Sequence, residues 1–223
     1  MNYNHISSVP EFPCQIVGLR HGQSKANIKI VKGAERAGII VSHPENGLKE
    51  EWGLTEAGRM KVKNSIRQAL EDRILSKNVL IISSDFSRAK ESALIAAKLL
   101  NVDTDEIQYN KSLRERFFGD LEGKSADNYQ KVWDEDIRDP DSKKYGVESV
   151  NEVLERTTKV VHGLLDNPKI SGKSVLLVSH GDPLQILETG FRKTPVSKHR
   201  SLPEIQTGEI RAYTPTYTPK TNQ

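Results

Sequence analysis

Cysteine is almost absent from the 223-residue sequence, which also has only two methionines and two tryptophans. The single cysteine, Cys14, excludes an internal disulfide framework and a metal site made of several cysteines, and we expect it to be a buried hydrophobic side chain.

Uninterrupted apolar runs are only a few residues long, as at 79–82 and 175–178, whereas a transmembrane helix needs about 20 residues. Residues 1–10 lack the basic and apolar segments of a secretory signal peptide. We therefore expect a cytoplasmic or nuclear protein.

A strong excess of one charge is missing as well. The 33 lysine and arginine residues against 30 acidic residues leave a net charge of +3, which is weaker than the clustered excess of nucleic-acid-binding proteins. We expect neither a nucleic acid nor a membrane as partner, and the oligomeric state stays open. With 35% hydrophobic residues, the chain can bury one sizeable core. We predict one domain over 1–223, folded at about 14–213, with a flexible tail at 214–223.

Short apolar segments alternate with amphipathic helices along the chain. Strands are predicted at 15–19, 79–83 and 175–179, and the last two are apolar throughout, as in a sheet covered on both faces. Helices are predicted at 55–74, 87–100, 149–165 and 183–188. Thr55 and Asp182 are the expected N-caps of the first and the last helix, and Ser149 with Glu152 has the spacing of a capping box. This alternation predicts the α/β class with a mostly parallel sheet.

Two stretches have no clear periodicity. Residues 28–53 are rich in glycine and charge, and we expect a long loop there. Residues 118–147 mix short helical signals with the turn sequence Asp139-Pro140-Asp141, and we expect a lid over one end of the sheet. Its acidic run, 134–136, is interpreted as a solvated helix face.

Basic and imidazole side chains follow each predicted strand. Arg20, His21 and Gly22 end the first segment, Arg88 comes five residues after the second, and His180 with Gly181 ends the third. Ligands of parallel sheets bind at the carboxyl ends of the strands, so we expect these groups at one edge. Any one of them alone is more often structural, but their convergence favours a functional site.

Arg88 lies in the first turn of its predicted helix, where a cation opposes the helix dipole. A helix N-terminus favours anions, and the guanidinium groups of Arg20 and Arg88 match the oxygens of a phosphate. The sequence therefore indicates a phosphoryl ligand.

A neutral imidazole can attack phosphorus, and a carboxylic acid must then protonate the leaving oxygen. Glu115 is the candidate acid, because Phe117 and Phe118 beside it can desolvate the carboxyl group and raise its pKa. The alternative is a surface glutamate paired with Arg114 or Arg116. Spacing alone does not decide between the two.

Several motifs in this order resemble the histidine phosphatase superfamily, in its phosphoglycerate mutase-like branch. They are Leu19-Arg20-His21-Gly22-Gln23-Ser24 with Asn27, Leu54-Thr55 with Gly58, Ser83–Ala89, Leu113-Arg114-Glu115 with Phe118-Gly119 and Glu122-Gly123, Glu148-Ser149 after Gly146, and Val178-Ser179-His180-Gly181. The resemblance covers residues 14–213. It implies a three-layer α/β/α sandwich with a mostly parallel sheet and one antiparallel strand.

The resemblance also implies residue roles. His21 would be the nucleophile that becomes phosphohistidine, and Glu115 the proton donor. Arg20, Arg88 and His180 would hold the phosphoryl oxygens. Asn27 and Gly181 would contact the substrate, which is a phosphorylated small molecule or phosphoprotein. No metal and no cofactor are implied.

Three functions stay open at this stage. Arg116-Phe117-Phe118-Gly119 and Gly181-Asp182 resemble the phosphatase members, so a phosphomonoesterase leads. A cofactor-dependent phosphoglycerate mutase would need more basic residues, and Lys25, Lys29, Lys32 and Arg36 are candidates, although a solvated loop face is the preferred interpretation. A non-catalytic phosphate-binding scaffold ranks last, because His21 and Glu115 are both present. A second basic group, at 192–200, either extends the anion site or is a surface cluster.

Overall fold

The computed structural model describes residues 3–31 and 34–214 of the chain. Its centre is a five-stranded sheet in the order β5-β4-β6-β1-β7. The strands are β1 (Gln15–Arg20), β4 (Val79–Ser83), β5 (Gln108–Tyr109), β6 (Ser174–Ser179) and β7 (Ile210–Ala212). All neighbouring strands are parallel except β1 and β7, which are antiparallel. The predicted α/β class, its mostly parallel sheet and its one antiparallel strand are confirmed.

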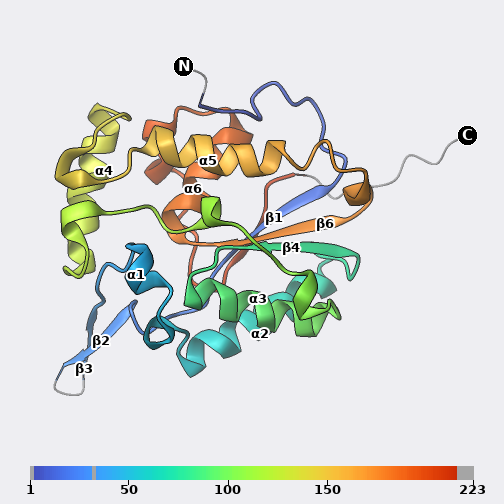
Figure 1. Cartoon of the computed structure of the whole chain (residues 1–223), viewed down its shortest axis with the longest axis horizontal. Coiled ribbons are helices and arrows are strands. Elements are labelled where there is room, and N and C mark those ends of the chain that lie inside the picture. Colours follow the sequence, from blue (N-terminus) through green and yellow to red (C-terminus); the bar gives the residue numbers. More distant parts are fainter. Residues whose placement is uncertain (1–2, 32–33, 215–223) are drawn as a thin grey trace, which may run out of the picture.

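Helices cover both faces of this sheet (Figure 1). On one face, α2 (Glu56–Glu71) and α3 (Ser87–Leu100) pack against side chains such as Val17 and Leu176. On the other face, side chains of α5 (Val150–His162) and α6 (Gly181–Arg192) pack against Ile16, Val175 and Leu177. β1 and β6 are buried on both faces, which explains why their sequences are nearly continuously apolar.

The last predicted helix is longer than its sequence pattern suggested. It was expected at 183–188 with Asp182 as N-cap, but α6 spans Gly181–Arg192 and its N-cap is His180. Asp182 therefore lies inside the first turn, where its negative charge interacts favourably with the helix dipole. Gly190, in its last turn, lets α6 approach α5 closely, because a Cβ there would come within 3.1 Å of Thr158.

Residues 28–53 are not one long loop. The segment contains the antiparallel hairpin of β2 (Ile28–Val31) and β3 (Ala34–Ala37), the short helix α1 (Pro44–Gly47) and a 3-10 turn, η1 (Glu50–Trp52). Its second half is ordered by the distant Glu122 carboxylate, which accepts hydrogen bonds from Ser42, His43 and Asn46 at 2.7–3.0 Å. Because these hydrogen bonds join residues about 80 positions apart in the chain, no periodic pattern within 28–53 could indicate them.

Residues 118–147 form a group of short helices at one end of the sheet (Figure 1). The longest is α4 (Tyr129–Arg138), and 3-10 turns lie at η4 (Gly119–Leu121), η5 (Ala126–Asn128) and η6 (Lys144–Gly146). They enclose a small separate core of Ile40, Phe118, Leu121, Val132 and Val147. The remaining 3-10 turns are η2 (Thr104–Glu106), η3 (Lys111–Leu113), η7 (Pro168–Ile170) and η8 (Val196–Ser201).

Two smaller expectations concern the ends of the chain. Cys14 is buried, as predicted, and burial raises the pKa of its thiol to about 11. Thr214 is fixed, because its hydroxyl accepts a hydrogen bond from Ile16 N at 2.8 Å, so that position is not part of a flexible tail; 215–223 lie outside the described residues. No helix in the described part of the chain is long and apolar enough to cross a membrane.

The capping box of α5 is confirmed and gives a test of the fold. Ser149 Oγ accepts from Glu152 N at 3.2 Å, and Glu152 Oε2 accepts from Ser149 N at 3.0 Å. We expect Ser149→Ala to lower the free energy of unfolding by about 1 kcal/mol, because it removes the cap. Urea denaturation measures this. Ser171→Ala, at an exposed position, is the control, and an equal effect of both would contradict the prediction.

Candidate active site

The pairing of β1 with β6 brings two histidines together. Arg20 and Ser179 are register partners at the ends of these strands, and His21 and His180 follow them directly. The two rings lie with their centroids 5.0 Å apart, edge to face, and both side chains are buried. The edge predicted for the site is therefore the edge where the structure places these residues.

The ring orientation of His21 is fixed by two neighbours. Nδ1 lies 2.7 Å from Gly22 O, and since a carbonyl only accepts, Nδ1 carries the hydrogen. Nε2 is then an acceptor and receives a hydrogen bond from Arg88 Nε at 3.1 Å. Burial and the positive charges of Arg88 and Arg20 lower the pKa of His21 well below its usual value. His21 is thus a neutral imidazole with its lone pair on Nε2.

His180 is oriented from the opposite side. Its Nε2 lies 3.0 Å from Ser84 Oγ, which itself accepts from Phe86 N. The hydroxyl hydrogen of Ser84 can therefore be donated to Nε2, and in that tautomer Nδ1 carries the ring hydrogen. Nδ1 lies 3.9 Å from Glu115 Oε2 and has no hydrogen-bond partner among the described residues. Burial, first of all, lowers the pKa of His180 well below its usual value.

Two arginines supply further hydrogen-bond donors to the site. Arg88 lies in the first turn of α3, as predicted, and is buried. Its Nη2 donates to Val41 O at 2.9 Å, while Nη1 has no partner within the described part of the chain. Arg20 Nη1 donates to Ile205 O at 2.6 Å, and its Nε is likewise unpartnered. Buried donors without acceptors cost about 1–3 kcal/mol each, so their presence indicates a ligand rich in acceptors.

Glu115 is not a surface glutamate. Its side chain is 11% exposed, and Oε2 lies 4.0 Å from Arg88 Nη2. Burial, followed by the charge of Asp182, raises its pKa to about 7 against the attraction of Arg88. The alternative partners are taken elsewhere: Arg114 makes a two-point ion pair with Asp85, and Arg116 makes one with Asp136.

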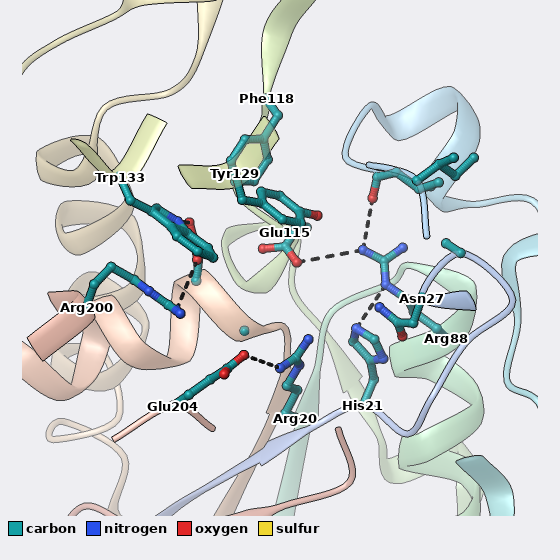
Figure 2. Close-up of a pocket in the computed structure, with 15 residues that line it drawn as sticks. Arg20, His21, Asn27, Arg88, Glu115, Phe118, Tyr129, Trp133, Arg200 and Glu204 are labelled. Carbon is teal, nitrogen blue, oxygen red and sulfur yellow. Dashed lines mark hydrogen bonds and ion pairs between the residues drawn. The ribbon is translucent and has the colours of Figure 1, made fainter. Parts of the chain in front are cut away.

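Arg20, His21, Arg88 and Glu115 line one cavity of about 100 Å³, shown in Figure 2. His180, whose ring contacts that of His21, is not among the described residues that line it. Asn27 and Gly181 both line it, as predicted. Asn27 is held by its Oδ1, which accepts from Ser24 N and Ser24 Oγ at 2.9 Å each. Gly181 lies against Arg20, where a Cβ would be 3.3 Å from the guanidinium carbon. Their roles toward a substrate stay predictions.

The cavity also has walls from two segments in which the sequence had singled out only Arg200, as part of the basic group at 192–200. Tyr129 and Trp133 come from α4, while Arg200 and Glu204 come from the segment after α6. The Arg200 guanidinium lies 3.8 Å above the Trp133 ring, which in turn stacks on Tyr129 at 5.5 Å. Within the basic group at 192–200, Arg200 therefore lines the cavity, whereas Arg192 forms an ion pair with Glu188. Lys25 is exposed and outside the cavity, whereas Lys32 lies outside the described residues.

A buried ion pair between Arg116 and Asp136 joins the loop that carries Glu115 to α4. Arg116 donates to Asp136 at 2.6 and 2.8 Å, and its Nη1 lies 3.6 Å from Asp182 Oδ2. Trp133 Nε1 donates to the same Asp182 carboxylate at 3.2 Å. The interpretation of 134–136 as a solvated face is therefore wrong for Asp136, which is buried to support the segment that carries Glu115.

Comparison with known proteins agrees with this geometry. The model of the histidine phosphatase superfamily (branch 1) matches residues 16–218. A 2,3-bisphosphoglycerate-dependent phosphoglycerate mutase of Parvibaculum lavamentivorans is 30% identical over 180 residues, which are 78% of this chain and 78% of that protein. A mutase of the same description from Nitrobacter winogradskyi is 27% identical over 177 residues, 77% of this chain and 78% of that one.

Solved structures with this fold include phosphatases. A mycobacterial glucosyl-3-phosphoglycerate phosphatase superposes with a TM-score of 0.68 at 22% identity, over 89% of each chain. The alpha-ribazole phosphatase from Shigella flexneri gives a TM-score of 0.63 at 20% identity, again over 89% of each chain. At these identities the likeness establishes the fold.

Removing one partner of the buried pair tests its contribution. We expect Asp136→Asn to lower the free energy of unfolding by about 3 kcal/mol, because buried Arg116 would lose its two-point ion pair and keep only the more distant Asp182 carboxylate, at 3.6 Å, as a counter-charge. Asp134→Asn on the exposed side of the same helix is the matched control, with an expected change within about 0.5 kcal/mol. Urea unfolding compares the two. Similar losses in both variants would contradict a special contribution of the Arg116–Asp136 pair.

Proposed function

The chain belongs to the histidine phosphatase superfamily, whose relatives named above transfer phosphoryl groups, and we propose that it is a phosphomonoesterase that works through phosphohistidine. The observation that carries the proposal is the set of unpartnered buried donors around His21: Arg20 Nε, Arg88 Nη1 and His180 Nδ1. A phosphoryl group has acceptors for all of them.

The first step uses the neutral His21. Its Nε2 lone pair attacks phosphorus. The hydrogen bond that Arg88 Nε donates to this nitrogen is redirected to a phosphoryl oxygen. The bond between phosphorus and the ester oxygen breaks as the bond to nitrogen forms. Protonated Glu115 gives its proton to the leaving oxygen, so that the alcohol departs neutral. The raised pKa of Glu115 keeps that proton available near neutral pH.

The second step reverses the roles. Glu115, now a carboxylate, takes a proton from a water molecule that attacks the phosphohistidine. The bond between phosphorus and nitrogen breaks, inorganic phosphate leaves, and His21 regains its lone pair. One water is consumed, and the proton ends on Glu115 as at the start. The cavity of about 100 Å³ suits a phosphoryl group with a small alcohol better than a phosphoprotein.

A phosphoglycerate mutase is the second candidate, because the curated relatives at 27–30% identity carry that description. A mutase must bind a bisphosphate in two orientations, which calls for surplus positive charge. Among the residues whose side chains the structure describes, the cavity lining instead has three arginines (Arg20, Arg88 and Arg200) and three acidic residues (Glu115, Asp182 and Glu204). This balance favours the phosphatase. Stimulation of phosphoglycerate interconversion by 2,3-bisphosphoglycerate would favour the mutase.

The nucleophile is tested by replacing it. We expect the wild-type protein to release phosphate from a panel of phosphorylated metabolites in EDTA, and His21→Ala to lose at least about 10³-fold of that rate. Acid-labile labelled phosphate should be trapped on the wild-type protein alone. His162→Ala, at an exposed histidine, serves as control. Equal release by the wild-type protein and His21→Ala would contradict the proposal.

The acid is tested by its pH dependence. Only protonated Glu115 can donate, so kcat/KM for an alkyl phosphate should fall as the pH rises through about 7. We expect Glu115→Gln to be about 10²- to 10⁴-fold slower and to lack this descending limb. Glu45→Gln, 84% exposed in its side chain, should keep the wild-type profile. A descending limb near pH 7 that persists in Glu115→Gln would assign the titration to another group.

A further inference from the structure

Glu204 places a carboxylate at the rim of the cavity, beside the proposed phosphoryl site. Its Oε1 lies 3.7 Å from Arg20 Nη1, and its side chain is 52% exposed. Figure 2 shows Glu204 below the cavity next to Arg20, with Trp133 and Arg200 on the side away from Arg88 and Asn27. A leaving group that extends from a phosphoryl group on His21 toward Trp133 therefore passes this carboxylate.

The backbone around Glu204 is held in place. Arg211 donates through Nη1 to Pro203 O at 2.8 Å and through Nη2 to Glu204 O at 3.2 Å. The next residue, Ile205, is buried, and its carbonyl accepts from Arg20 Nη1 at 2.6 Å. The backbone that carries Glu204 is consequently fixed at the rim, and the ion pair with Arg20 directs its carboxylate toward the cavity.

Substrate binding leaves this carboxylate without a counter-charge. A phosphoryl dianion takes over the positive charge of Arg20, which is the ion-pair partner of Glu204. Arg200 does not replace it, because its Nη1 donates to Gln185 at 2.5 Å and lies 4.0 Å from the Asp182 carboxylate. A positive group on the leaving alcohol would restore the balance, whereas a negative group would add a second repulsion.

We propose that Glu204 is a specificity-determining residue that selects phosphate monoesters by the charge of their leaving alcohol, favouring a cationic alcohol over a neutral one and a neutral one over an anionic one. This inference rests on the proposed function and narrows its substrate class to phosphorylated amino alcohols and polyols. It places bisphosphates and phosphorylated carboxylic acids last.

Three small esters that differ in leaving-group charge test the inference. They are phosphoethanolamine (positive), glycerol 3-phosphate (neutral) and 3-phosphoglycerate (negative). For the wild-type protein we expect kcat/KM to fall in this order, by about three- to tenfold per step at low ionic strength, and the steps to shrink in high salt. Glu204→Gln should reduce the spread to less than about threefold in total.

Glu51→Gln is the matched control. Glu51 is 61% exposed and lies 4.0 Å from Lys49, so it resembles Glu204 in exposure and pairing but does not line the cavity. It should keep the wild-type order. An equal change of all three kcat/KM values in Glu204→Gln would overturn the inference, because Glu204 would then act only on the phosphoryl group. A wild-type order that does not follow charge would overturn it too.

Binding measurements separate this inference from the proposed function. Calorimetric titration of the His21→Ala protein with the same three esters requires no hydrolysis. If the affinities follow the charge order and the double variant with Glu204→Gln loses it, the inference stands even for a protein that releases no phosphate. If phosphate is released but neither rates nor affinities depend on Glu204, the proposed function stands and the inference falls.

Discussion

Two arginines and two histidines lie together at one edge of the sheet, largely out of water, and the energetic cost of holding positive charge there governs the site. The protein limits this cost in two ways. Both imidazoles stay neutral, because burial and the neighbouring guanidinium groups lower their pKa values. Carboxylates lie next to the arginines, with Glu115 4.0 Å from Arg88 and Glu204 3.7 Å from Arg20. The remaining unpartnered donors form a site whose complement is a phosphoryl group. Burial, together with the charge of Asp182, raises the pKa of Glu115 to about 7 against the attraction of these arginines, so the acid can hold its proton near neutral pH.

The pairing of β1 with β6 holds the two histidines in place despite this cost. A parallel register that ends at Arg20 and Ser179 places the next residue of each strand, His21 and His180, side by side. Both strands are buried on both faces, so a shift in register would expose apolar side chains or bury polar ones. The positions of the two histidines are therefore tied to the buried central strands of the sheet.

The other side of the cavity is built from segments with weaker local preferences. The helix α4 and the segment after α6 meet through Trp133 and Arg200, and the buried pair of Arg116 with Asp136 joins α4 to the loop of Glu115. In the proposed reaction this wall would face the leaving alcohol. Relatives with a common phosphoryl site and different substrates would be expected to differ here, since loops and short helices tolerate change more easily than buried strands do.

The sequence by itself determined the α/β class, the three central strands, the helix at 87–100, and the capping box and most of the helix predicted at 149–165, which ends at His162 in the structure. It also indicated that Arg20, His21, Arg88 and His180 gather at one edge of the sheet, whereas Glu115 as the acid came from the family resemblance. Those features are local: apolar runs, helical spacing, and polar residues placed directly after strands. Only the tertiary structure decided that Glu115 is buried, that Asp136 supports the loop of the acid, and that Arg200 and Glu204 reach the cavity. It also decided the hairpin and short helix within 28–53, whose order depends on the distant Glu122. These outcomes depend on contacts between residues far apart in the chain, and a charged side chain looks the same in sequence whether it is solvated or paired in the interior.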